Sequence, residues 1–284
     1  MLDFDKQLEK LVNDAIAEDV GSGDHSTLST IPADATGKAQ LKIKEDGILA
    51  GVAVASKIFH QLEPGSSLEI FKQDGEQMKY GDLAFIVSAH VHTILKGERL
   101  VLNVMQRMSG IATLTRKYTE KLQGYHTRVL DTRKTTPNFR LLEKEAVKIG
   151  GGINHRFGLF DMIMLKDNHI DYCGGIEKAI ERAYEYVQRV NPQLKIEVET
   201  RSVEDVRKVV AMAKGKVFRI MLDNFTPAMI NEAMPIINGE FETEASGGIN
   251  LDNLIGYAET GVDYVSVGAL IHQARSLDLS LKAI

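Results

Sequence analysis

The chain has 284 residues, of which 44% are apolar and 26% are charged, and its net charge is −5. This composition is typical of a globular protein with a sizeable core, and the negative charge argues against nucleic acid or an anionic membrane as a general partner. The one cysteine, Cys173, excludes an internal disulfide and a cysteine-cluster zinc site and fits a reducing cytoplasm.

The N-terminal 20 residues predict an amphipathic helix, and its acidic residues distinguish it from a signal or transit peptide. No apolar run reaches the length of a membrane span, so we expect a cytoplasmic protein. Residues 38–45 and 67–73 alternate in the way of half-buried strands, and 53–62 between them has helical spacing. These elements predict an α+β arrangement.

A long helix is predicted to begin near Val91 and to continue past Gly110, and the domain boundary is placed close to its end. We therefore expect an N-terminal α/β sandwich domain over residues 1–115 and a catalytic domain over 116–273. The tail, residues 274–284, is expected to pack back onto the first domain.

From about residue 127 the pattern becomes a repeat of short apolar strand, loop and helix, which predicts parallel strands with right-handed crossovers. The predicted strands are 128–132, 162–165, 195–199, 218–222, 242–246 and 264–268. The predicted helices between them are 177–190, 202–213, 227–237 and 251–260, and Pro227 suits a first helical turn.

The two faces of these strands differ. In residues 195–199 the apolar Ile196 and Val198 share one face, whereas Glu197 and Glu199 share the other. Strands covered by helices on both faces would be apolar on both, so helices outside and a functional interior favour an incomplete or distorted (β/α) barrel of about six strands. Active sites of such barrels lie at the C-terminal ends of the strands.

Cations gather where the predicted strands end. Residues 131–169 carry seven basic and five acidic side chains in an otherwise acidic protein. A group of cations repels itself unless an anion occupies it, so we interpret Arg133, Lys134, Arg156 and Lys166 as an anion site, with structural ion pairs as the alternative. Arg140, Lys144 and Lys148 recur every four residues and predict a solvated helix face.

Two glycine-containing strand ends, 246–248 and Gly268, predict backbone N–H groups directed at a phosphate. Glu197 and Asp223 are predicted to point inward from neighbouring strands, where they can hold sugar hydroxyls, magnesium or a developing positive charge. Salt bridges to Lys195 or Arg219 are the competing interpretation. Together these features describe a site for a phosphorylated sugar and a carboxylated partner.

The motifs that carry this site resemble quinolinate phosphoribosyltransferase, the decarboxylating nicotinate-nucleotide pyrophosphorylase. The resemblance extends over essentially the whole chain, and the combination of motifs is far more specific than any one of them. The motifs are EDVGSGDHST (18–27), KGERLVLNVMQRMSGIAT (96–113), TRKTTP (132–137), GGGINHRFGLFDMIMLKDNH (150–169), IEVE (196–199), MLDNF (221–225), EASGGI (244–249) and GVDYVSVGALIH (261–272). Two segments depart from the family pattern, KVFRIMLDN (216–224) and IHQ (271–273).

The resemblance implies a pentosyltransferase of NAD biosynthesis that converts quinolinate and phosphoribosyl pyrophosphate (PRPP) into nicotinate mononucleotide, pyrophosphate and CO2, with Mg2+. It also implies a homodimer, or a larger assembly of dimers, in which one subunit's first domain completes its partner's site. On this basis the quinolinate-facing residues are Arg99 (donated across the dimer), Arg133, Lys134, His155, Arg156 and Lys166. The PRPP-facing residues are Lys134, Glu197, Asp223, Ser246, Gly247, Gly248 and Gly268.

Within this set Lys134, Lys166, Glu197 and Asp223 are expected to be catalytic, and the two acids are expected to reach Mg2+ through PRPP. Departure of pyrophosphate leaves an oxocarbenium-like ribose, which the acids stabilise while the pyridine nitrogen attacks C1′. The cationic nitrogen then stabilises the carbanion that the departing CO2 leaves.

Three other functions remain open from the sequence. A sibling phosphoribosyltransferase would use another carboxylated heterocycle, and a Schiff-base lyase would use Lys134 or Lys166 as a nucleophile. A biotinyl-type carrier would be modified on Lys79, which follows Met78.

Overall fold

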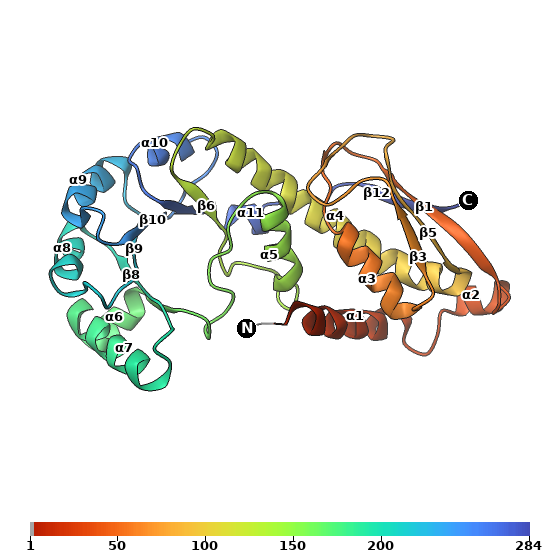
Figure 1. Ribbon diagram of the computed structural model, residues 1–284, viewed down its shortest axis with the longest axis horizontal. Coiled ribbons are helices and arrows are strands. Elements are labelled where there is room, and N and C mark those ends of the chain that lie inside the picture. Colours follow the sequence, from red (N-terminus) through yellow and green to blue (C-terminus); the bar gives the residue numbers. More distant parts are fainter. Residues whose placement is uncertain (1–2) are drawn as a thin grey trace. The chain divides into compact units, whose positions relative to one another are not determined.

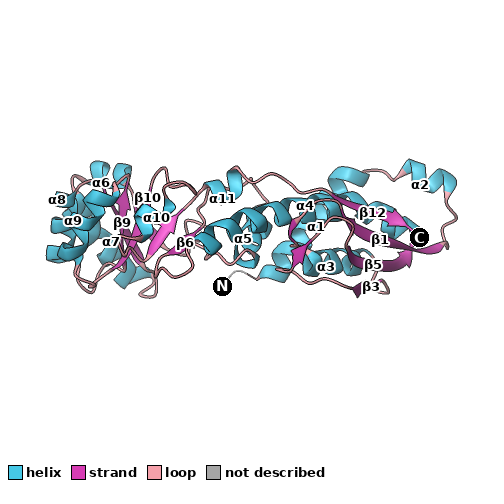
Figure 2. Cartoon of the chain, turned by 90° about the horizontal axis from the view of Figure 1, so that it is seen from above, coloured by secondary structure: helices cyan, strands magenta, loops and turns pink. Residues whose placement is uncertain are grey.

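The computed structural model describes residues 3–284, and these form two compact units (Figures 1 and 2). The first unit comprises residues 3–116, Thr135–Gly151 and Leu270–Ile284, and the second comprises Lys117–Lys134 and Gly152–Ala269. None of the helices in this described part of the chain has the length and apolarity needed to cross a membrane.

The first unit is built on an antiparallel sheet with the strand order β12-β1-β5-β3, as Figure 2 shows. Alternate side chains of the central strands are buried, as expected for a sheet with one covered face. The strands of this unit are β1 (Thr36–Ile43), β2 (Gly47–Ile48), β3 (Ser67–Ile70), β4 (Gln77–Met78), β5 (Leu83–His90) and β12 (Leu279–Ala283). Its helices are α1 (Phe4–Val20), α2 (His25–Thr30), α3 (Val52–Leu62), α4 (Val91–Lys121), α5 (Arg140–Ile149) and α11 (Ala269–His272), of which α4 and α11 run across the division between the units.

The second unit is a sheet of six parallel strands in the order β6-β11-β10-β9-β8-β7. Its strands are β6 (Arg128–Leu130), β7 (Ile163–Leu165), β8 (Ile196–Thr200), β9 (Arg219–Asp223), β10 (Glu242–Ser246) and β11 (Tyr264–Ser266). Its helices are α6 (Asp167–Cys173), α7 (Ile176–Val190), α8 (Val203–Met212), α9 (Pro227–Ile237) and α10 (Leu254–Ala258). Figure 1 shows the helices outside the curved sheet, and no ladder joins β6 to β7 among the residues described, so the barrel is incomplete as predicted.

The predicted barrel strands and helices are confirmed, with boundaries that shift by a few residues. The two predicted strands of the first domain are β1 and β3, and the long helix α4 begins at Val91 as expected. Helix α9 begins with Pro227, and the hydroxyl of Thr226 accepts a hydrogen bond from the backbone N–H of Met229. Thr226 and Pro227 therefore define where this helix begins.

Helix α5, which the sequence analysis places in the second domain, belongs to the first unit. An ion pair connects α5 to α4: Arg107 of α4 donates from both Nε and Nη2 to Glu143 Oε1, at 2.9 and 2.8 Å. Glu143 is 0% exposed and also accepts the N–H of Thr136. The predicted solvated face of α5 is wrong at Lys144, which is 1% exposed.

The C-terminal segment crosses α4 before it enters the sheet of the first unit, where β12 pairs antiparallel with β1. At the crossing, a Cβ added to Gly110 would lie 1.8 Å from the backbone oxygen of Arg275. The N–H of Leu277 donates to the oxygen of Gln106, one helical turn away. Gly110 therefore permits the close approach of two backbones.

We expect Gly110→Ala to destabilise the protein by about 3 kcal/mol or more, because the clash involves backbone atoms that cannot rotate away. Helix propensity alone predicts the opposite sign, a gain of about 1 kcal/mol. Urea unfolding measures the difference.

Gly256→Ala in α10 is the matched control, because its Cβ would meet only Pro227 Cγ at 3.7 Å. We expect this variant to be neutral or more stable. Equal stability of Gly110→Ala and the unsubstituted protein would contradict the packing described for α4.

Candidate functional site

The C-terminal edge of the parallel sheet brings together most of the predicted site residues. Every strand of the sheet runs in the same direction, so all six carboxyl ends meet at one edge. The predicted site residues that belong to the second unit are Arg133, Lys134, His155, Arg156, Lys166, Glu197, Asp223, Ser246, Gly247, Gly248 and Gly268. Arg99 belongs to the first unit and is exposed on α4.

Three charged groups form an edge cluster at the carboxyl ends of β7, β8 and β9: Lys166 follows β7, Glu199 lies in β8 and Asp223 is the last residue of β9. Lys166 Nζ lies 3.7 Å from Glu199 Oε2, and the N–H of Asp167 donates to Glu199 Oε1 at 3.4 Å. Burial raises the pKa of Glu199, and the negative charge of Asp223 raises it further. Glu199 therefore shares the edge with Asp223, although the sequence analysis selected Glu197 for that place.

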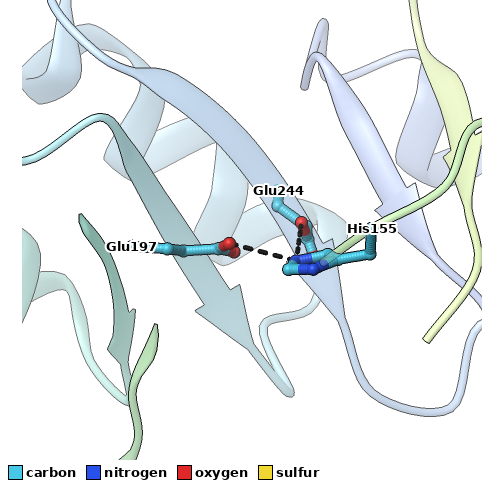
Figure 3. Close-up of side chains that lie close together, drawn as sticks. All are labelled: His155, Glu197 and Glu244. Carbon is cyan, nitrogen blue, oxygen red and sulfur yellow. Dashed lines mark ion pairs between the residues drawn. The ribbon is translucent and has the colours of Figure 1, made fainter. Parts of the chain in front are cut away.

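Glu197, one pleat repeat further from the strand end, belongs to a separate interior cluster with His155, Arg219 and Glu244. His155 Nε2 lies 3.0 Å from Glu197 Oε2 and 3.3 Å from Glu244 Oε2, and Figure 3 shows both carboxyl groups directed at the imidazole. Arg219 Nη1 lies 3.0 Å from Glu244 Oε2 and 3.9 Å from Glu197 Oε2. Both glutamates are 0% exposed.

The interior cluster bears out the competing salt-bridge interpretation for Arg219 but not for Lys195. The ammonium group of Lys195 instead lies over the ring of Phe218, 3.7 Å from its centroid. The predicted contacts of Glu197 with ribose and metal stay a prediction, and the contacts observed are with His155 and Arg219.

Two hydrogen bonds hold His155 in place, one at its backbone nitrogen and one at the ring nitrogen Nδ1. The backbone N–H of His155 donates to Asp131 Oδ1 at 2.8 Å, and the backbone N–H of Arg156 donates to the ring atom Nδ1 at 2.7 Å. With Nδ1 accepting, Nε2 carries the ring proton toward the two carboxylates.

Burial lowers the pKa of His155, and the carboxylates of Glu197 and Glu244 raise it to about 9. A second ring proton would have to replace the hydrogen bond that Nδ1 accepts from Arg156, however. Burial and the charge of Glu244 raise the pKa of Glu197 to about 7. We therefore assign the additional proton of this cluster to Glu197.

The same three side chains, His155, Glu197 and Glu244, could in principle ligate a metal, because they offer ligand atoms within 4.8 Å of one another. The guanidinium of Arg219 already lies against Glu244 Oε2 at 3.0 Å. A further cation beside it would be repelled, so an internal ion cluster accounts for these residues better than a metal centre does.

Arg133 and Arg156 repel each other electrostatically. Burial lowers the pKa of Arg156, and the charge of Arg133 lowers it further. Arg156 Nη1 donates to the backbone oxygen of Met162 at 3.2 Å, and Nη2 lies 3.6 Å from Met164 Sδ. Two neighbouring arginines that repel each other form a favourable site for an anion with more than one charge.

The loop after β10 has the conformation expected of a phosphate-binding turn. Gly247 and Gly248 have φ angles of 101° and 62°, in the left-handed region that side chains disfavour. The side-chain amide of Asn253 donates to the oxygen of Gly248 at 3.1 Å. This fixes the turn before the first residue of α10.

Sequence reasoning missed Glu244 and assigned Glu197 to the strand-end position. The signal for Glu244 was present, because Glu242, Glu244 and Ser246 share one face of β10 by the same alternation that was applied to β8 and β9. The alternation predicts that both Glu197 and Glu199 point inward. It does not predict which of them lies nearer the carboxyl end of the barrel.

Comparisons with known proteins identify the family. Residues 24–109 match the model of the quinolinate phosphoribosyl transferase N-terminal domain, and residues 111–282 match the model of its C-terminal domain. The chain is 43% identical over 288 residues to quinolinate phosphoribosyltransferase [decarboxylating] 2b, mitochondrial, of Nicotiana tabacum, covering 97% of this chain and 82% of the relative.

A bacterial relative and a solved structure agree with this. The chain is 40% identical over 275 residues to the probable nicotinate-nucleotide pyrophosphorylase [carboxylating] of Bacillus subtilis (strain 168), covering 97% of this chain and 93% of the relative. The crystal structure of NadC from Streptococcus pyogenes matches with a TM-score of 0.90 and 39% identity over 98% of each chain.

The raised pKa of Glu197 makes a testable contribution to stability. A carboxyl group whose pKa is about 7 in the folded protein and about 4.5 in the unfolded chain stabilises the fold below pH 4.5. That contribution is lost as the pH rises to 7, and it amounts to about 3 kcal/mol. Glu197→Gln should therefore have a flatter dependence of unfolding free energy on pH between 5 and 8.

Denaturant unfolding at a series of pH values tests this, with the exposed Glu259→Gln as the control. The control should follow the unsubstituted protein throughout. If Glu197→Gln also follows it, Glu197 is ionised in the folded protein and the proton assignment is wrong.

Proposed function

The chain belongs to the quinolinate phosphoribosyltransferase family, and we propose that it converts quinolinate and PRPP into nicotinate mononucleotide, pyrophosphate and CO2. The reaction makes it a decarboxylating pentosyltransferase of NAD biosynthesis. One observation carries the proposal for this chain's own residues: cations, acids and a glycine turn meet at the carboxyl edge of a single parallel sheet.

Quinolinate has two adjacent carboxylates, and the proposed site for them is the pair Arg133 and Arg156 with Lys134 and Lys166. The repulsion between Arg133 and Arg156 supports this, because a dianion relieves it. His155 serves the same site indirectly, since its ring is engaged by Glu197 and Glu244 and its nitrogen Nδ1 holds the backbone of Arg156.

PRPP lies at the other end of the edge in this proposal. The turn formed by Ser246, Gly247 and Gly248, together with Gly268, receives the 5′-phosphate through backbone N–H groups. The acids Asp223 and Glu199 hold the ribose hydroxyls.

Mg2+ suits the pair of acids at the edge. Glu199 and Asp223 offer carboxylate oxygens, and the charge of Asp223 raises the pKa of Glu199, an effect that a divalent cation would reverse. The two residues would hold the ion with the phosphates of PRPP. When bound, it supplies positive charge to the departing pyrophosphate.

The protein's own residues then position and stabilise the reacting groups. Departure of pyrophosphate breaks the C1′–O bond and leaves positive charge on the ribose ring, which the carboxylates of Asp223 and Glu199 stabilise. The cations beside quinolinate hold its nitrogen toward C1′, and the new N–C1′ bond makes that nitrogen cationic. The ring then retains the electron pair of the bond to the departing CO2, and a proton takes its place on carbon.

Two further properties belong to the same proposal. A second copy of the chain donates Arg99 to the quinolinate end, so the working unit is at least a dimer; exposure of Arg99 in the chain is consistent with that. The location is the cytoplasm, which the single cysteine suits. The plant relative from Nicotiana tabacum is named as mitochondrial.

The direct test of the reaction uses purified protein with quinolinate, PRPP and Mg2+. We expect nicotinate mononucleotide and CO2 in equal amounts. Nicotinate offered in place of quinolinate lacks one carboxylate and should be used at least about 100-fold less efficiently, because the cation site would be left partly uncompensated. Preference for another carboxylated heterocycle would indicate a sibling enzyme.

We expect Arg156→Ala and Lys166→Ala to lower kcat/KM by at least about 100-fold, the usual effect of removing one charged partner from a site of this kind. Lys208→Ala is the control, because Lys208 is exposed on α8 and belongs to none of the strand ends that form the site. Circular dichroism should show that each variant is folded. Near-normal kinetics in either site variant would remove that residue from the site.

A further inference from the structure

One residue joins the two PRPP-facing elements of the edge. Asn224 follows Asp223 at the end of β9, and its side-chain Nδ2 donates to Asp223 Oδ2 at 2.7 Å. Its backbone N–H donates to the oxygen of Ser246 at 2.8 Å, at the end of the neighbouring strand β10. A hydrogen bond to a carboxylate of this length is among the stronger ones that an amide makes.

The backbone of Asn224 is unusual in the same way as that of the loop beside it. Its φ angle is 56°, in the left-handed region that asparagine tolerates better than most residues do. Sequence alone places the residue in the MLDNF motif but assigns it no role. The conformation turns the chain so that the side chain lies back against Asp223 and the backbone stays paired with β10.

Gly247 packs against Asn224 where the ends of β9 and β10 meet. A Cβ added to Gly247 would lie 2.2 Å from Asn224 Oδ1 and 3.0 Å from Asn224 Cα. The φ angle of Gly247, 101°, would also strain any other residue. Asn224 and the turn after β10 are therefore packed against each other without space for a side chain.

We propose that Asn224 is a positioning residue that couples the carboxylate of Asp223 to the turn formed by Ser246, Gly247 and Gly248. The inference rests on the proposed function, in which Asp223 holds the ribose and the turn holds the 5′-phosphate. These two groups of PRPP are separated by a fixed number of bonds, so their binding groups must keep a fixed spacing. Asn224 sets that spacing, and it touches neither quinolinate nor the reacting carbon.

Asn224→Gly is the primary test, because glycine adopts the left-handed conformation freely and only the amide is lost. We expect KM for PRPP to rise about 10-fold and KM for quinolinate to change less than about 2-fold. Asn224→Asp keeps the shape of the side chain but places a second carboxylate against Asp223, so its loss of kcat/KM should exceed that of Asn224→Gly.

The matched control is Asn238→Gly. Asn238 has a φ angle of 48° and is exposed at the end of α9, away from the strand ends. It shares the backbone strain of Asn224 and lacks its partners. We expect both KM values of this variant to stay within about 2-fold of the unsubstituted protein.

A double substitution separates coupling from simple loss of stability. Gly247→Ala should lower kcat/KM at least about 10-fold more in the unsubstituted protein than in Asn224→Gly, because removing the asparagine side chain removes the 2.2 Å contact. Thermal unfolding of each variant gives the accompanying change in stability.

The outcomes are distinct. If the unsubstituted protein turns over and Asn224→Gly has unchanged kinetics, or affects both substrates equally, the inference is wrong and the proposed function stands. Additive effects of Asn224→Gly and Gly247→Ala would also overturn it. Absence of turnover in the unsubstituted protein would overturn the proposed function and the inference together.

Discussion

The interior of the barrel depends on the internal neutralisation of two buried glutamates. Glu197 and Glu244 are 0% exposed, and their carboxyl groups converge on His155 from β8 and β10, the two strands that flank β9 (Figure 3). A carboxylate buried without partners costs several kcal/mol, which is a large share of the stability of a typical domain. Arg219 and the ring of His155 offset that cost, and the proton on Glu197 lowers the charge that remains.

This arrangement divides the inward face of the sheet into two levels. At the lower level the protein's acids are paired with Arg219 and with the ring of His155. One pleat repeat toward the carboxyl ends, Lys166, Glu199 and Asp223 lie at the edge, and Lys166 keeps about half of its side-chain surface exposed. Because Arg219 and His155 serve the lower acids, the edge cations remain in position for a substrate with several negative charges. His155 also holds the backbone of Arg156, whose N–H donates to its ring.

Period-two alternation predicted the barrel, its strands and the inward face well. The reason is that the apolar face of each parallel strand must pack against the helices, which places the polar face inside. The same rule marks Glu197 and Glu199 alike and could not say which of them reaches the strand end. The burial of Lys144 could not be predicted for a similar reason. A four-residue repeat of cations shows that the residues share a helix face, but it does not show whether that face is covered by other elements. The contact of Asn224 with Gly247 joins ends of two strands, and no local pattern encodes that distance.

The most direct measurement is a crystal structure of the protein with quinolinate and an analogue of PRPP whose pyrophosphate cannot depart. The account predicts quinolinate carboxylates within hydrogen-bond distance of Arg156 and Lys166, and ribose hydroxyls on Asp223 and Glu199. Glu197 and Glu244 should keep their contacts with His155. Ribose or quinolinate bound directly to Glu197 or Glu244, with the interior cluster opened, would contradict the separation of the two levels.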